Sequence, residues 1–465
     1  MVMMMGHVRG ITMQRMIGIV TAGILASTHG ATVASADASS VSVATLDVTA
    51  LLTAARGAPP MICAFAAHSV RGNSWGEWSD APATPLGNTT VSNRDMRDAP
   101  FADADVDTLL GALASDDACV RELSVRLLGS QQKSDKVNGA LISRLASSDA
   151  SMREVASFGL GMTEPTSAID PLRKALGDAT PGVRANSAWA LGRMRSGQAL
   201  PQLVGLFRDN SEMVRQSAVI AAGHIDSSSA VPALMRVLQN DESPNVRRVA
   251  AWALGQKEAR EATDVLATAL ASDKDTRVRE MSAWAIANTR GRSGSTALAT
   301  ALRRDAEDNV RETSAWALAE IGDRGSVDAL AAAAENDKSS KVRGTAAWAL
   351  GEMAGRGTPA SAGLRRLLKD ESDDTRLKAA WALGQIGDAS AVNDIRDALK
   401  AEQTSSVRRA LLRALVKSGG KSEDALTELL NSSDASVREA AVRGLVGNNS
   451  FNPWPWPWPR PRPFP

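Results

Sequence analysis

The sequence predicts an all-α protein built as a solenoid of about eleven helical hairpins. Three observations predict it: a segment typified by Val278 to Ile286 returns about every thirty-two residues, each copy starts with a helix-capping position, and each copy carries apolar residues at helical spacing. A single hydrophobic core does not grow by repetition. The units therefore stack in a row, each against its neighbours.

One arginine, which we call the marker arginine, recurs in every copy: Arg121, Arg153, Arg184, Arg215, Arg247, Arg279, Arg311, Arg343, Arg376, Arg408 and Arg438. Four positions upstream, ten of the eleven copies carry Asp, Ser or Thr, whose side-chain oxygens cap the first turn of a helix. Pro181 and Pro244 follow two of these caps, where a missing amide hydrogen is harmless. Gly322 and Gly387 suit helix ends. A helix therefore contains each marker arginine.

The other half of each copy predicts a second helix. Ala262, Val265, Leu266, Ala269 and Leu270 follow one another at spacings of one, three and four residues, which trace one stripe of a helix. Each unit is then a pair of short antiparallel helices.

The copies at 246–255 and 342–351 both read Val-Arg-x-x-Ala-Ala-Trp-Ala-Leu-Gly. This pattern resembles the HEAT-repeat family, in particular its bacterial HEAT-like subgroup with repeats of the phycobilin-lyase type, over residues 104–447. The resemblance implies a right-handed α-solenoid. It does not specify a function, because one fold hosts many functions.

An arginine in a first helical turn opposes the helix dipole and needs a compensating anion. An aspartate stands six residues before the marker arginine in seven consecutive units. HEAT proteins pair similar residues as a ladder between repeats, which implies a structural ladder here: Asp241, Arg247, Asp273, Arg279, Asp305, Arg311, Asp337 and Arg343. Glu402 replaces the aspartate in a later unit. The alternative is a row of arginines that binds an external anion.

Tryptophan recurs five residues after the marker arginine, on the side of the helix opposite the core: Trp189, Trp252, Trp284, Trp316, Trp348 and Trp381. In the HEAT arrangement this helix lines the concave side, so the rings predict a stripe that binds a partner. The alternative is packing of each ring across the neighbouring repeat. Four glycines favour packing, each three residues after a tryptophan: Gly192, Gly255, Gly351 and Gly384. Both interpretations can hold together.

Residues 1–36 read as a secretory signal, with Arg9 and Arg15 before a short apolar segment and a cleavage site after Ala36. They predict a secreted or periplasmic protein without a lasting membrane anchor. The alternative is the disordered start of a cytoplasmic protein. Residues 37–103 form a linker that contains two candidate cap helices, at 47–55 and 60–71.

Cys63 and Cys119 are the two cysteines of the chain. In an oxidising compartment they can join the N-terminal region to the first repeat. Two separate thiols are the alternative.

The segment 448–465 is rich in Pro, Trp and Arg, and proline at every second position excludes a helix. Trp454, Trp456 and Trp458 make it a second candidate for partner binding. It can add to a sheet edge, bind a groove as a polyproline ligand, lie at a membrane interface, dock within its own chain, or stay solvated.

Little in the sequence indicates catalysis. A net charge of +1 does not indicate nucleic-acid binding, and neither a metal site nor a cofactor is expected. His68 and His224 lie in different regions, and Gly72 to Gly76 fits the G-x-S-x-G pattern without its strand-to-helix context. We therefore expect a non-enzymatic scaffold of the cell envelope that binds a protein or peptide. The alternatives are a lyase-type subunit acting on a protein substrate and a carrier of a membrane-active tail.

Overall fold

The computed structural model describes residues 47–57, 101–131, 134–289, 291–354 and 362–418, and the single residues 430, 431, 435, 438 and 442. All regular structure in these residues is helical and none of it is a strand, so the predicted all-α solenoid is confirmed. The predicted signal segment 1–36, the second cap helix at 60–71 and the tail 448–465 lie outside the described residues. No helix among the described residues has the length and apolar character needed to cross a membrane.

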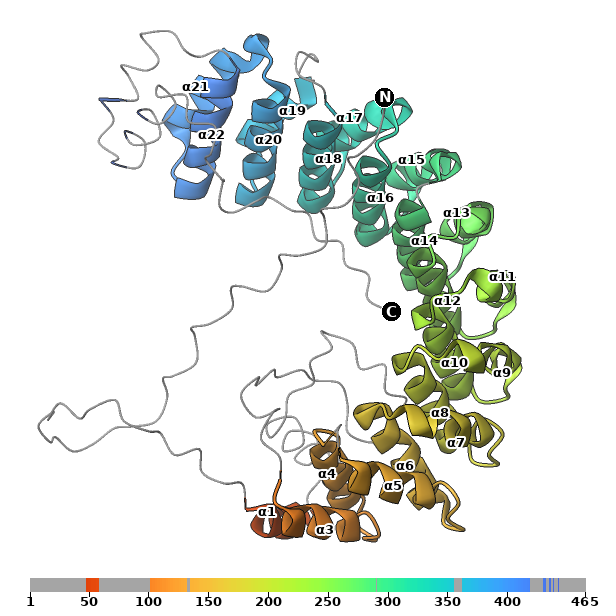
Figure 1. Ribbon diagram of the computed structural model, residues 1–465. Helices are drawn as coiled ribbons and strands as arrows, with labels where there is room; N and C mark the ends of the chain where they lie inside the picture. Colours follow the sequence, from red (N-terminus) through yellow and green to blue (C-terminus); the bar gives the residue numbers. More distant parts are fainter. Residues whose placement is uncertain are drawn as a thin grey trace, which may run out of the picture. The chain divides into compact units, whose positions relative to one another are not determined.

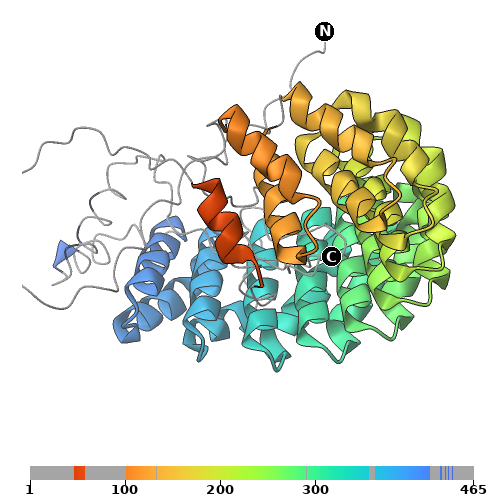
Figure 2. The ribbon, with the colours of Figure 1, turned by 90° about the horizontal axis from the view of Figure 1, so that it is seen from below.

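The helices form two layers, because every hairpin contributes one helix to each (Figures 1 and 2). The first helices are α3 Asp103–Ala112, α5 Asp135–Arg144, α7 Ile169–Ala175, α9 Leu200–Gly205, α11 Val231–Asn240, α13 Thr263–Ser272, α15 Ser295–Arg304, α17 Val327–Asn336, α19 Ala362–Arg366 and α21 Val392–Ala401. The second helices are α4 Ala118–Leu128, α6 Ala150–Thr163, α8 Pro181–Arg193, α10 Glu212–His224, α12 Pro244–Gln256, α14 Thr276–Thr289, α16 Asp308–Ile321, α18 Ser340–Met353, α20 Asp373–Ile386 and α22 Ser405–Lys417. From α4 to α22, each second helix packs against the next.

Ten hairpins therefore lie in the described ranges. Most of the eleventh predicted unit, marked by Arg438, falls outside them.

The second helices begin where the capping pattern predicts. Asp117, Asp149 and Ser243 accept hydrogen bonds from amides of the first turn, as N-caps do. Thr404 and Ser339 stand at the same position without capping, because their hydroxyls donate to aspartates of the preceding unit. At these two positions the expected cap thus serves a contact between units instead.

The core lies between the two layers. Val278, Ser282 and Ile286 of α14 are fully buried and face the first helix of the same unit, where Leu266 and Leu270 are buried. Residues four apart on a helix share one face, which is why the apolar stripe of the sequence becomes the core. The opposite face of α14 points away from the first-helix layer.

Among the described residues, one helix precedes the hairpins. Helix α1, Val48–Ala55, coincides with the first predicted cap helix and packs on α3 and α4. Gly57 follows it with a φ of +71°, and its amide donates to Asp117 at 2.7 Å. Asp117 also caps α4, so one carboxylate ties α1 to the first hairpin. Cys119, in the next turn, is disulfide-bonded, and the other cysteine, Cys63, lies outside the described residues.

Candidate functional site

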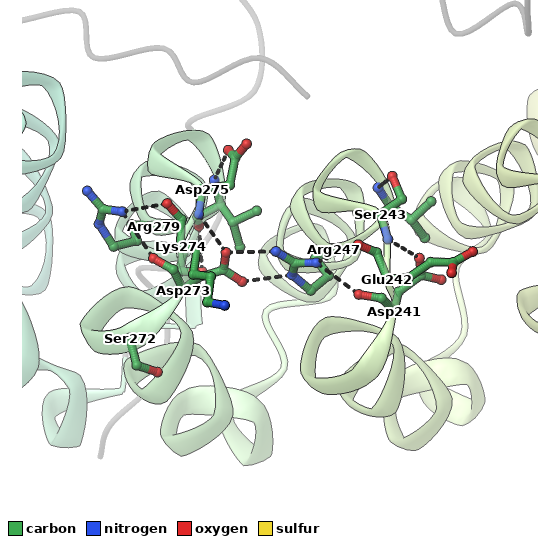
Figure 3. A network of polar contacts seen from close by, with 12 residues as sticks. Asp241, Glu242, Ser243, Arg247, Ser272, Asp273, Lys274, Asp275 and Arg279 are labelled. Carbon is green, nitrogen blue, oxygen red and sulfur yellow. Dashed lines mark hydrogen bonds and ion pairs between the residues drawn. The ribbon is translucent and has the colours of Figure 1, made fainter.

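The marker arginines connect consecutive units through a repeated set of contacts. Arg247 donates from Nε and Nη2 to both carboxylate oxygens of Asp273, at 2.8 and 2.9 Å (Figure 3). Its Nη1 donates to the backbone carbonyl of Asp241, six residues earlier, at 2.9 Å. Asp273 in turn accepts from the amide of Asp275. Each carboxylate therefore holds the arginine of the preceding unit and orders the turn before its own second helix.

The same contact occurs between every pair of neighbouring units from α6 to α22. The rungs are Arg153–Asp178, Arg184–Asp209, Arg215–Asp241, Arg247–Asp273, Arg279–Asp305, Arg311–Asp337, Arg343–Asp370 and Arg376–Glu402, with closest N–O distances of 2.7 to 2.9 Å. Glu402 thus fills the position where the aspartate pattern departs. We call this series the ladder.

The ladder is largely sheltered from solvent and is electrostatically self-contained. The hydrogen bond to Asp305 raises the pKa of Arg279, and the bond from Arg376 lowers the pKa of Glu402. The three nitrogens of each guanidinium in the central rungs already donate to protein oxygens. These contacts explain the recurrence of the marker arginines as a structural feature, because the guanidinium groups do not need an external anion. The ladder fixes how consecutive second helices lie against each other.

The face of the second helices that points away from the first helices carries the predicted tryptophans, which we call the indole row. Trp189, Trp252 and Trp348 are buried, with 6%, 5% and 3% of their surface exposed. Trp284, Trp316 and Trp381 are only partly buried. Trp284 and Trp316 belong to neighbouring helices, α14 and α16, so the accessible indole edges include two adjacent units.

Four of the six indoles, Trp189, Trp252, Trp284 and Trp381, pack over a glycine of the preceding unit. A Cβ on Gly223 would lie 2.5 Å from Cζ3 of Trp252, and a Cβ on Gly255 would lie 2.8 Å from Cζ3 of Trp284. These four rings pack over a glycine about thirty residues earlier, as the packing interpretation requires, whereas no such glycine meets Trp316 or Trp348 among the described residues. Gly192 meets Ala221 instead, because the following unit carries isoleucine in place of tryptophan.

Toward the N-terminal end of the indole row, neighbouring side chains of the same protein cover the rings. Phe158 stacks on Trp189 with ring centroids 5.1 Å apart and planes 10° apart. The guanidinium of Arg126 lies over Phe158, and that of Arg193 lies over Trp189. His224 meets the edge of Trp252. These contacts cover ring faces that a partner would otherwise use.

Around the accessible indoles lies a group of carboxylates that the sequence reasoning missed. Glu280 and Glu312 stand four residues before Trp284 and Trp316, while Glu320 and Glu352 stand four residues after Trp316 and Trp348. Residues four apart share one helix face, so these four glutamates flank the indole row on both sides. We call them the acidic patch. A glutamate four residues before or after Trp284, Trp316 and Trp348 is the sequence signal that identifies the acidic patch.

The acidic patch is strained electrostatically. Burial raises the pKa of Glu280, and the nearby carboxylate of Glu312 raises it further. Burial also raises the pKa of Glu312, although Lys378 opposes this and Thr345 donates to Glu312 at 3.1 Å. Glu320 and Glu352 are exposed. Partial burial of the carboxyl group raises the pKa of Glu320 and of Glu352 as well, and Glu320 raises the pKa of Glu352 further. Within the described residues, no ion pair to any of the four glutamates is formed, and each gains from a cation brought by a ligand.

The remaining sequence candidates do not assemble into a catalytic site within the described residues. His224 packs against Trp252, and the described part of the chain holds no group of three or more His, Cys, Asp or Glu side chains arranged to bind a metal. His68, the pattern at 72–76 and the tail tryptophans Trp454, Trp456 and Trp458 lie outside the described residues.

A family model described as HEAT repeats matches four stretches of the chain, at 138–221, 205–287, 295–375 and 361–446. Together these stretches cover more than half of the sequence. No match was found among curated protein sequences.

Solved structures with similar folds include two importins. Importin beta matches with a TM-score of 0.53 and 14% identity over 73% of this chain and 57% of its own. Yeast importin-beta, Kap95p, matches with a TM-score of 0.53 and 14% identity over 86% of this chain and 62% of its own. The CpcE–CpcF complex of phycocyanin lyase from Nostoc sp. PCC7120 is 24% identical over 49% of this chain and 91% of its own, with a TM-score of 0.32. At these identities the first two likenesses concern the fold.

Proposed function

Because this chain belongs to the HEAT-repeat family, we propose that it is a non-catalytic scaffold that binds a polypeptide partner on the concave side of the solenoid, at the face of the second helices that points away from the first helices. The observation that carries the proposal is the pair of partly exposed indoles, Trp284 and Trp316, on adjacent helices. Tryptophan is enriched at binding hot spots because it offers a large, rigid apolar surface with one hydrogen-bond donor. The ladder supports the proposal, since it holds neighbouring helices in a fixed register and so preorganises the face.

The chemistry of this face also favours a polypeptide. A peptide supplies apolar side chains for the indoles and amide or cationic donors for the acidic patch around them. Several units in a row present such groups at a spacing of ~10 Å, the distance between packed helices. An extended segment of a partner can therefore contact consecutive units in turn.

The test is selection of peptides from a random displayed library on the full-length protein, followed by measurement of their dissociation constants. We expect Trp284→Ala/Trp316→Ala to weaken the selected peptides about 30-fold, as truncation of a hot-spot tryptophan does. The matched control is Arg303→Ala/Arg304→Ala, a pair of exposed residues on the first-helix layer, which should leave the constants unchanged. Circular dichroism checks that both variants keep their helices. Equal binding by the two variants would remove the indole row from the proposal.

The proposal includes a location outside the cytoplasm, either periplasmic or secreted. Two observations support it: the signal-like pattern of residues 1–36, and the disulfide-bonded state of Cys119, which is typical of oxidising compartments. Sequencing the N-terminus of the protein recovered from its host tests it, with Asp37 expected as the first residue. An uncleaved N-terminus together with a cytoplasmic location would overturn this part and leave the binding proposal standing.

A further inference from the structure

The acidic patch and the partly exposed indoles of the indole row lie side by side on the second helices. Glu280, Glu312, Glu320 and Glu352 carry negative charge on three consecutive helices, α14, α16 and α18. Between them lie the partly exposed indoles of α14 and α16. A ligand that satisfies both must bring cations and flat apolar groups in an extended arrangement, because both kinds of group recur on consecutive helices.

The chain contains such a segment. Residues 454–462 read Trp-Pro-Trp-Pro-Trp-Pro-Arg-Pro-Arg, and no acidic residue follows Glu439. Its indoles and guanidinium groups are hydrogen-bond donors, whereas its prolines supply no amide donor. The acidic patch offers acceptors, so the two surfaces are complementary in charge and in hydrogen bonding. Proline at alternate positions also disfavours a helix, which lowers the entropic cost of binding in an extended form.

The length of chain is sufficient. Val442 is the last described residue, and Trp454 follows it by twelve residues, which span ~37 Å in polyproline geometry. The eleventh unit, which contains Val442, lies three units beyond α18, or ~30 Å at the spacing of packed helices. The segment from Trp454 to Arg462 then spans ~25 Å, enough to pass from α18 across α16 to α14.

We propose that residues 454–462 dock on the acidic patch and indole row of their own chain, on α14, α16 and α18, and compete there with the external partner. This inference rests on the proposed function, because it assigns an internal competitor to the same face. Arginines 460 and 462 pair with the glutamates, and the tail indoles and prolines stack on Trp284 and Trp316. An external ligand must displace the tail, so its apparent affinity is lowered by the fraction of occupied faces.

The test places a photo-crosslinker in the full-length protein, by Phe464→p-benzoylphenylalanine, and maps the cross-linked peptides by mass spectrometry. We expect products at the mass of one chain, with the attachment in residues 276–289, 308–321 or 340–353. Products at the mass of two chains would assign the face to the tail of a second copy. Attachment elsewhere, or none, would overturn the docking.

A matched pair of charge variants tests the cause of docking. Glu280→Gln/Glu320→Gln removes two carboxylates of the acidic patch on α14 and α16, where the path of the tail places the arginines, and the yield should fall about fivefold, as expected for loss of two charge pairs. Glu261→Gln/Asp264→Asn removes two exposed carboxylates at the first-helix layer and should leave the yield within about twofold. Arg460→Gln/Arg462→Gln should reproduce the loss from the side of the tail. Equal yields in the two carboxylate variants would refute the role of the acidic patch.

The two proposals can fail separately. If peptides selected from the library still require Trp284 and Trp316 while the tail cross-links elsewhere, the scaffold stands and the internal competitor falls. If the tail cross-links to α14, α16 or α18 while selected peptides ignore the indoles, the face binds the tail and does not bind the partner.

Discussion

Two adjacent acids at one rung of the ladder should contribute very differently to stability. The Asp370 carboxylate accepts hydrogen bonds from Nε of Arg343 at 2.7 Å and from the amide of Ser372 at 3.0 Å, and its side chain is 5% exposed. Glu371 pairs with the same arginine at 3.6 Å, and its side chain is 85% exposed. Asp370→Asn and Glu371→Gln each remove one charge with almost no change in shape. The contrast therefore isolates burial and hydrogen bonding from charge number.

The magnitudes follow from these environments. Removing one partner of a buried ion pair costs about 3 to 5 kcal/mol. Arg343 keeps two backbone acceptors, the carbonyls of Asp337 and Lys338, so we expect about 2 to 3 kcal/mol for Asp370→Asn. Glu371→Gln should cost less than about 0.5 kcal/mol, the range of exposed pairs. A difference of about 2 kcal/mol corresponds to a factor of about 30 in an equilibrium constant.

Hydrogen exchange resolved by helix is the suitable assay, because arrays of repeats can open unit by unit and do not always unfold in one step. Exchange in α18 and α20, which flank the rung, should be about 30-fold faster in Asp370→Asn than in Glu371→Gln. Exchange in α6 should be unchanged in both variants, since that helix lies many units away. Rates in α18 and α20 that agree within about threefold between the variants would refute the account of the ladder given above.

Three further predictions concern glycine and pH. Gly223→Ala should lower the free energy of unfolding by about 1 to 3 kcal/mol in urea, because the new methyl group meets the rigid ring of Trp252. The control, Gly139→Ala, lies at an open helical position and should raise the free energy of unfolding by up to about 1 kcal/mol. A stabilised Gly223 variant would contradict the close packing. Burial raises the pKa of Glu312, so its contribution destabilises the fold as pH rises above the ordinary glutamate range, and Glu312→Gln should increase the free energy of unfolding at neutral pH relative to acidic pH. The opposite sign holds for Glu402, because the hydrogen bond from the Arg376 guanidinium lowers its pKa. The stability that Glu402 contributes to the fold is complete above the ordinary glutamate pKa and is lost as pH falls through the lowered value. Glu402→Gln should therefore destabilise the protein at neutral pH and have no such effect in acid. Urea titrations across pH check both signs, and a pH-independent difference from the wild type in either variant would contradict the corresponding assignment.

The hairpins were predictable from sequence because their causes are local and repeated. The capping position, the apolar stripe and the marker arginine all lie within one unit, so each copy independently indicates the same pair of helices. The cap side chains were predicted less well. Thr404 carries the right type of side chain, yet its hydroxyl donates to Asp373 of the preceding unit. Contacts between units decide such details, and the pattern within one unit does not contain them.

The indole row shows the same limit more clearly. Sequence position predicts that the six tryptophans are equivalent, but the structure buries three and leaves three partly exposed. The difference depends on what the neighbouring units present: Trp252 packs over Gly223 and against His224, whereas the helices around Trp316 carry the acidic patch. Which tryptophans remain exposed therefore depends on the residues of the neighbouring units, and the pattern within one unit does not predict it. Reading four residues to either side of each tryptophan would have revealed it.

Every rung joins an arginine to an acid of the following unit by the same geometry. A whole helical hairpin can therefore be added to the array or removed from it without breaking the ladder. Excision of one whole module, between equivalent points, would bring the arginine before the gap to an equivalent acid after it and restore the contact. Loss of only a few residues in an inter-helix turn would instead misalign every atom of that joint. Duplication and loss during evolution should therefore occur in complete modules, and lengthening at either end would leave the acidic, tryptophan-bearing middle unchanged.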